Sequence, residues 1–161
     1  MLKIKLITTG SLSEKYWKDA SNEYIKRLNS YASFSEVVLK EVRVPQNPSE
    51  SDVKNALDEE AKKVLQYITS KSFVVALCVE GDQYSSPQLS ELIEKATING
   101  KSEIVFIIGS AYGLSDIIKN RADVKLSLSK LTFPHQLSKV ILLEAVYRAL
   151  DIAKGGKYHK A

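Results

Sequence analysis

Cysteine, methionine, tryptophan and histidine are scarce in this 161-residue chain, which has one, one, one and two of them respectively. The lone Cys78 cannot form an intrachain disulfide, and no Cys/His spacing indicates a zinc site. No uninterrupted apolar run approaches the roughly 18 residues that a membrane span needs. The sequence therefore predicts a protein of the reducing cytoplasm, without an export signal, a membrane segment or a metal.

Two common nucleotide-binding signatures are also missing. The chain contains neither a GxGxxG motif nor a Walker lysine motif, which disfavours a dinucleotide or a nucleoside triphosphate as ligand. The net charge is +4, and the basic excess is strongest at the end of the chain. From Lys139 onward, five basic residues accompany two acidic ones, a balance that suits a polyanionic partner such as RNA.

The hydrophobic pattern predicts one α/β domain over residues 1–161, with a mostly parallel sheet flanked by helices. The short apolar runs at 73–79 and 104–108 are typical of strands that are covered on both faces. The other strands are expected at 2–8, 34–44 and 124–128. Helices are expected at 15–31 after a cap at Ser13, and at 52–68, 87–98, 115–120 and 134–153.

Three of these helices carry further expectations. On the first, Tyr16, Trp17 and Tyr24 recur at helical spacing, which predicts that they belong to the core. On helix 52–68, a dense band of charged residues opposite the apolar face is expected to be solvated. The apolar positions of helix 134–153 cover more of the helix circumference than one face of a sheet could bury. We therefore expect a second partner, the same helix of another copy in a homodimer.

Three loops follow strands that would end at the same edge of the sheet, where α/β proteins bind ligands. Gly109–Leu114 follows one strand, and its glycine allows backbone to approach a ligand closely. The irregular stretch 128–136 follows another, and Leu77–Gly81 follows a third. Together they predict a pocket with apolar side chains for an adenine ring. The glycine-rich segment by itself is equally consistent with a tight strand-to-helix turn.

The two histidines, His135 and His159, are the side chains best suited to move a proton near neutral pH. A lone histidine is more often structural, and His135 at a helix start also suits a capping role. Tyr158 and His159 lie among lysines in the tail GGKYHKA, a mixture that stacks on bases and holds phosphate. A frayed, disordered tail is an equally good interpretation of that composition.

The order of the motifs resembles one family along essentially the whole chain. These motifs are the KYW helix, VVALCVEG, VFIIGSAYGL, LSLSKLTFPHQL, ILLEAVYRA and a terminal KYHK. They are similar to those of the ribosomal RNA large-subunit methyltransferase H family, a minimal branch of the SPOUT methyltransferases. The resemblance implies a SPOUT-type fold with a C-terminal trefoil knot, a topology that general rules make rare.

The resemblance also implies an activity. The expected reaction is methyl transfer from S-adenosylmethionine to N3 of a pseudouridine in 23S (large-subunit) ribosomal RNA, with the assembled ribosome as substrate. The family target is pseudouridine 1915 in helix 69. The chain departs from the family at Ser110, where a second glycine usually follows the first, so the adjoining turn is expected to differ slightly.

Carried over by motif, the cofactor-binding positions fall in three short segments. They are Leu77, Gly109, Leu128, Ser129, Lys130, Leu131, Thr132 and Phe133. For catalysis we assign His159 as the base or a base-orienting group and Tyr158 to stack on or hydrogen-bond the flipped base. Arg148 or Lys154 would hold phosphate or the developing negative charge.

Two other function classes compete with this assignment. One is a non-catalytic ribosome-associated RNA-binding module that keeps the pocket. The other is an oxidoreductase on a dinucleotide-binding fold, for which the missing GxGxxG is the weak point. Assays of methyl transfer to ribosomes and of nicotinamide cofactor binding distinguish the methyltransferase, the binding module and the oxidoreductase.

Overall fold

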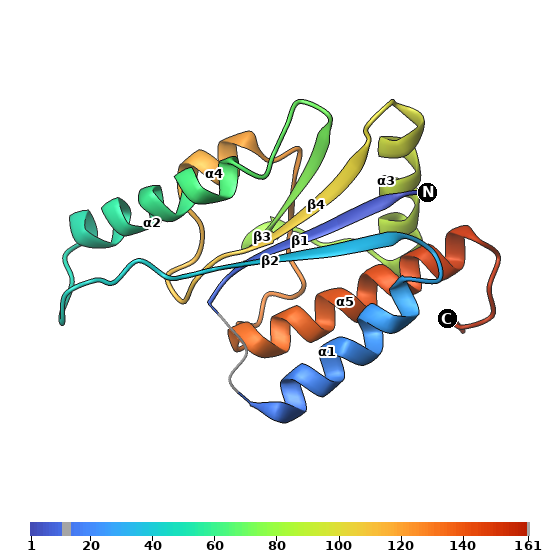
Figure 1. Ribbon diagram of the computed structural model, residues 1–161, viewed down its shortest axis with the longest axis horizontal. Helices are drawn as coiled ribbons and strands as arrows, with labels where there is room; N and C mark the ends of the chain where they lie inside the picture. The colour runs from blue at the N-terminus through green and yellow to red at the C-terminus, as the bar shows by residue number, and fades with distance from the viewer. Residues whose placement is uncertain (11–13, 161) are drawn as a thin grey trace.

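The computed structural model describes residues 1–10 and 14–160, and the strands in this part of the chain form one parallel five-stranded sheet (Figure 1). The strand order is β2-β1-β4-β3-β5, and every neighbouring pair is parallel. The strands are β1 Lys3–Thr9, β2 Ser33–Leu39, β3 Ser72–Asp82, β4 Glu103–Ile108 and β5 Val124–Leu126. The predicted α/β class with a mostly parallel sheet is thus confirmed.

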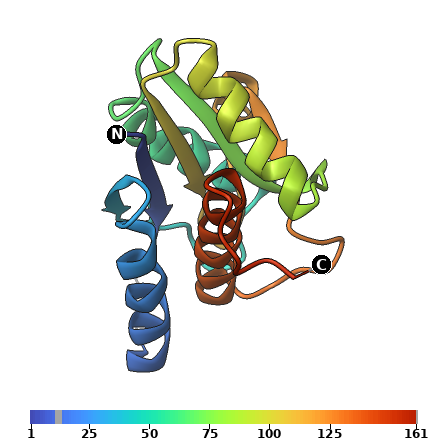
Figure 2. The ribbon, with the colours of Figure 1, turned by 90° about the vertical axis from the view of Figure 1, so that its right-hand side faces the viewer.

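Helices cover both faces of the sheet (Figures 1 and 2). The helices are α1 Lys15–Leu28, α2 Glu50–Leu65, α3 Ser86–Ile98, α4 Asp116–Arg121 and α5 His135–Ala153. Successive side chains of a strand point to opposite faces, so Ile104 and Phe106 of β4 pack in the core beneath α1, α3 and α5. Val105 and Ile107 pack in the second core, beneath α2 and α4. None of the helices in the described residues is long and apolar enough to cross a membrane.

Helix α5 lies on the sheet between α1 and α3, and both pack against it (Figure 2). Leu142, Leu143 and Val146 of α5 are fully buried in the core that these elements share. The flanking helices therefore supply a second partner for the broad apolar surface of α5. The apolar surface around α5 therefore does not by itself require another copy of the chain, and the homodimer stays a prediction. The trefoil knot also stays a prediction.

Several predicted boundaries differ from the structure. The second strand stops at Leu39 rather than 44, because β1 is its neighbour and ends where Thr9 pairs with Leu39. Residues just beyond Leu39 have no ladder partner in the described part of the chain. Helix α2 begins earlier, at Glu50, because Ser49 and Asp52 form a capping box. Ser13, the expected first cap, lies outside the described residues.

The prediction that the aromatic residues of α1 belong to the core is wrong for Tyr16, which is 63% exposed, and Trp17 and Tyr24 are half-buried. The first turns of α1 project past the sheet, as Figure 2 shows, so side chains there have no strand to cover. Only the last turns lie over the sheet, and there Leu28 is fully buried.

Candidate functional site

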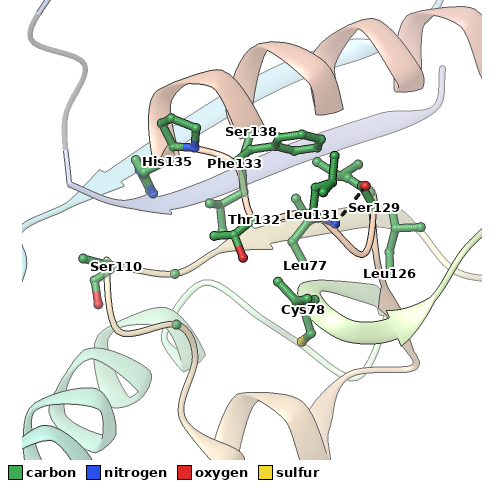
Figure 3. Close-up of a pocket in the computed structure, with 17 residues that line it drawn as sticks. Leu77, Cys78, Ser110, Leu126, Ser129, Leu131, Thr132, Phe133, His135 and Ser138 are labelled. Carbon is green, nitrogen blue, oxygen red and sulfur yellow. Dashed lines mark hydrogen bonds between the residues drawn. The ribbon is translucent and has the colours of Figure 1, made fainter.

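A cavity of about 380 Å³ lies at the carboxyl ends of β4, β3 and β5, beside the first turn of α5 (Figure 3). This volume is in the range of small-molecule sites. Seven of the eight predicted cofactor positions line the cavity, namely Leu77, Gly109, Leu128, Ser129, Leu131, Thr132 and Phe133. Lys130 does not line it, and its side chain is exposed to solvent.

Gly109 starts the tight turn that forms one wall of the cavity. The turn closes through a hydrogen bond from the amide of Gly113 to the carbonyl of Ser110, 2.9 Å long. A Cβ atom on Gly109 would lie 2.2 Å from the carbonyl oxygen of Gly113, far inside van der Waals contact. A side chain at position 109 is therefore incompatible with this turn. Gly113 contributes differently, since its φ of 91° favours glycine.

Ser110, the departure from the family pattern, is accommodated without strain. The φ angle of Ser110 is not positive, so this second position of the turn does not need a glycine. Its hydroxyl donates to Oε1 of Glu60 over 3.0 Å, and the amide of Val42 donates to Oε2 over 2.8 Å. Glu60 thus ties the cavity wall to α2 and to the segment after β2.

The loop between β5 and α5 forms the opposite wall, and two serines shape it. The amide of Ser127 donates to the carbonyl of Asp82, which pins the loop to the end of β3 over 2.8 Å. The Ser127 hydroxyl donates to the carbonyl of Ser129, and the amide of Leu131 donates to the Ser129 hydroxyl, both over 3.0 Å. These bonds turn the chain so that Thr132 and Phe133 face Leu77 across the cavity (Figure 3).

The cavity carries no full positive charge at neutral pH. Among the described residues that line it there is no lysine or arginine. Burial lowers the pKa of His135, opposed by the Glu41 carboxylate and by the backbone of Gly109, so the ring is neutral at pH 7. Burial likewise raises the pKa of the Cys78 thiol. Such an uncharged lining tolerates a cationic ligand.

The three predicted catalytic residues form a second group, on the C-terminal half of α5. The Arg148 guanidinium lies over the ring of Tyr158, 4.5 Å from its centre, and 3.3 Å from Nδ1 of His159. Glu144 links them, because its Oε1 accepts from Arg148 over 2.6 Å and from the Tyr158 hydroxyl over 3.2 Å. The tail is therefore packed on α5 rather than frayed, and Tyr158 and His159 are half-buried.

Charge and burial fix the protonation of this group. The hydrogen bond with Glu144 raises the pKa of Arg148, which therefore stays cationic. Burial, and then the Glu144 carboxylate, raise the pKa of Tyr158, so its hydroxyl keeps its proton and acts as a donor. Lys154, the alternative cation, is exposed at the end of α5.

The two groups lie apart along α5. Ser138 lines the cavity, and Arg148 follows ten residues later. At 1.5 Å per residue, this separates them by roughly 15 Å along the helix axis. Within one chain the structure thus brings together seven of the eight cofactor positions and, separately, the three catalytic positions, but it does not join the two sets.

A family model described as "Predicted SPOUT methyltransferase" matches residues 2–159 of the chain. "Ribosomal RNA large subunit methyltransferase H" of Streptococcus thermophilus (strain ATCC BAA-491 / LMD-9) is 45% identical over 99% of this chain and 100% of its own length. The chain belongs to this methyltransferase family. A relative of the same name from Bacillus pumilus (strain SAFR-032) is 43% identical over the same shares of the two chains.

The fold also agrees with the SPOUT family. The crystal structure of a probable methyltransferase from Bordetella pertussis Tohama I matches 92% of this chain and 95% of its own, with a TM-score of 0.56 at 16% identity. At that identity the likeness concerns the α/β fold alone, and the SPOUT assignment follows from the family model that matches residues 2–159.

Sequence reasoning missed two carboxylates of this SPOUT chain. Glu60 belongs to the charged band of α2 that we expected to be solvated, yet it is 6% exposed. No local pattern distinguishes it from its charged neighbours, because its partners Val42 and Ser110 are distant in sequence. Glu144 had a usable signal, since it precedes Arg148 by one helical turn, the spacing of an ion pair.

Proposed function

We propose that the protein is a cytoplasmic methyltransferase that uses S-adenosylmethionine and modifies N3 of a pseudouridine in 23S ribosomal RNA of the assembled ribosome. The observation that carries the proposal is the convergence of seven motif positions from three loops on one cavity. The names of the relatives, which specify large-subunit ribosomal RNA, support the substrate class. The family target, pseudouridine 1915 in helix 69, is the proposed site.

The size and the charge of the cavity suit the methyl donor. When bound, S-adenosylmethionine supplies an electrophilic methyl group on a positively charged sulfur. The uncharged lining accepts that charge without repulsion, and the bare backbone at Gly109 leaves room for close contact. Leu77, Leu128 and Phe133 supply apolar surface for an adenine ring, and the Ser129–Thr132 loop supplies backbone groups for its polar edge.

The tail group fits the acceptor base. N3 of a pseudouridine is protonated at neutral pH and becomes a good nucleophile once that proton is removed. We assign His159 as the acceptor of the proton. Tyr158, whose hydroxyl stays protonated, binds the flipped base, and the Arg148 cation stabilises the negative charge that develops on the base.

A complete site requires two copies of the chain, because about 15 Å of helix separates the cavity from Arg148. A twofold axis across α5 places the N-terminal half of one helix beside the C-terminal half of the other. Each cavity then receives Arg148, Tyr158 and His159 from the partner copy. This separation, rather than the apolar circumference of α5, is our reason for proposing a homodimer.

The direct test uses ribosomes that lack the modification and a donor with a radioactive methyl group. We expect label in the large-subunit RNA, and we expect His159→Ala to lower kcat by roughly 100-fold, as for loss of a general base, with donor affinity within twofold of wild type. Ribosome binding without any methyl transfer would instead establish the non-catalytic module. Raised salt should weaken association with ribosomes if phosphate contacts contribute.

A mixing experiment tests the shared site. His159→Ala lowers turnover, and Gly109→Ala weakens donor binding, so each variant alone has little activity when the donor is kept well below the weakened dissociation constant of Gly109→Ala. After the copies are exchanged, half of the dimers are mixed, and each mixed dimer contains one site with both parts intact. The mixture should recover about one quarter of wild-type activity, a fraction that follows from twofold symmetry. If mass spectrometry demonstrates mixed dimers but the mixture recovers no methyltransferase activity, the proposal of a shared site is wrong.

A further inference from the structure

Asp151, near the end of α5, is a buried carboxylate that the mechanism above does not use. It is 4% exposed, and both of its oxygens accept hydrogen bonds. The Tyr31 hydroxyl donates to Oδ1 over 2.7 Å, and the backbone amide of Tyr158 donates to Oδ2 over 3.0 Å. Buried carboxylates are costly unless such donors satisfy them. Asp151 therefore connects the turn before β2 to the C-terminal tail.

The chain reversal after α5 is shaped around the same residue. Gly155 adopts φ 69°, a left-handed conformation that ends the helix. The amide of Gly156 then donates to the carbonyl oxygen of Asp151 over 2.9 Å. A Cβ atom on Gly156 would lie 2.0 Å from Oδ1 of Asp151, so the tail backbone rests directly against the carboxylate.

These contacts determine where the aromatic part of the tail lies. Held at its amide, Tyr158 places its ring edge-on against Tyr147, with 4.9 Å between ring centres, and beneath Arg148. The next residue, His159, then reaches the Arg148 guanidinium. The ring of Tyr31 packs against that of Tyr147 at a tilt, with 5.9 Å between ring centres. Its hydrogen bond to Asp151 raises the pKa of Tyr31, so the hydroxyl remains a donor.

We infer that Asp151 is a positioning residue for the tail, which it holds so that Tyr158 and His159 are presented together with Arg148. The inference rests on the proposed function, because it assigns Asp151 to the half of the site that meets the RNA. Asp151 lies in the last turn of α5, whereas the donor cavity adjoins the first turn. Its loss should therefore affect turnover and spare donor binding.

Asp151→Ala, in the full-length protein, is the main test. It removes both acceptors, and we expect amide hydrogen exchange at Tyr158 and its neighbours to accelerate about tenfold, as for loss of one or two hydrogen bonds. We expect kcat on ribosomes to fall at least about tenfold, with the dissociation constant of S-adenosylmethionine within twofold of wild type. Asp19→Ala is the matched control, because Asp19 pairs with Lys15 on the surface of α1 and both measurements should stay at wild type.

The conservative variant Asp151→Asn distinguishes positioning from charge. The amide oxygen can accept from the Tyr158 amide, and the amide nitrogen can donate to the Tyr31 oxygen, so we expect slow exchange and near-normal kcat. Tyr31→Phe removes one donor and leaves the fold intact, which provides a test if Asp151→Ala does not fold. We expect a smaller acceleration of exchange in the tail, about threefold.

Two results would overturn the inference. One is unchanged tail exchange in Asp151→Ala or, if that variant does not fold, in Tyr31→Phe. The other is an equal loss of donor affinity and kcat, which would indicate general damage rather than a displaced tail. Failure of the proposed function is recognised separately: if the wild-type protein transferred no methyl group, Asp151→Ala would still accelerate exchange in the tail.

Discussion

Gly109→Ala is the sharpest test of the cavity, because its consequence can be worked out from one distance. The added Cβ would lie 2.2 Å from the carbonyl oxygen of Gly113, whereas ordinary contacts begin near 3.4 Å. The turn must therefore open by about 1.2 Å, against backbone that cannot rotate away. Overpacking of this kind costs about 1–3 kcal/mol. Since the displaced turn is a wall of the cavity, donor affinity should fall at least about tenfold, equivalent to 1.4 kcal/mol.

Calorimetric titration with S-adenosylmethionine measures the affinity, and urea unfolding measures the stability of the same variant. Gly100→Ala is the matched control, since Gly100 has φ 89° but nothing within 4 Å of its virtual Cβ. That variant should lose about 1 kcal/mol of stability through backbone strain and keep donor affinity. If Gly109→Ala binds the donor as tightly as wild type, the turn is not part of the donor site and our reasoning is wrong.

Three further predictions concern one half-buried and two buried polar groups. The pKa of His135 is lowered in the folded state, so between its folded value and the ordinary 6.5 the unfolded chain binds more protons. The free energy of unfolding should therefore fall as the pH drops below 6.5, and His135→Asn should lessen this dependence. Thermal unfolding of both proteins across this pH range is the measurement, and an equal pH dependence of the two would contradict the prediction. Lys139 is 5% exposed and pairs with Glu36, whose side chain is 23% exposed and so remains partly hydrated when Lys139 is removed. Lys139→Ala should therefore cost about 1–3 kcal/mol in urea unfolding, and no measurable loss would refute the pair's role. Glu60→Ala leaves the amide of Val42 without its acceptor and should cost about 1–3 kcal/mol, whereas Glu60→Gln keeps an acceptor and a donor and should cost less; equal losses would argue against these bonds.

The sequence predicted the parts of this fold that depend on local patterns. Short apolar runs identified β3 and β4, because strands covered on both faces need apolar residues at every position. Gly155 and Gly156 marked the end of α5, where the chain indeed turns at φ 69°. The loops were expected to share one edge of the sheet because parallel strands end together, and the cavity lies there.

Other features followed from contacts between distant residues. The length of β2 depends on where β1 ends, and the exposure of Tyr16 depends on how far α1 projects beyond the sheet. Lys130 belongs to the loop whose neighbours line the cavity, but the turn made by Ser129 and Leu131 directs its side chain outward. Such outcomes depend on the geometry of a neighbouring element, and the local sequence pattern contains no information about that geometry.

The sequence by itself determined the layout of alternating strands and helices, the loops that approach a ligand and the family to which the chain belongs, because periodicity and motifs are properties of adjacent residues. Tertiary structure decided that Glu60 and Asp151 are buried anchors and that the cavity and the tail group occupy opposite ends of α5. Burial and hydrogen bonding of a polar side chain depend on partners up to 120 residues away, such as Tyr31 for Asp151. Those partners become neighbours when the sheet and its helices assemble.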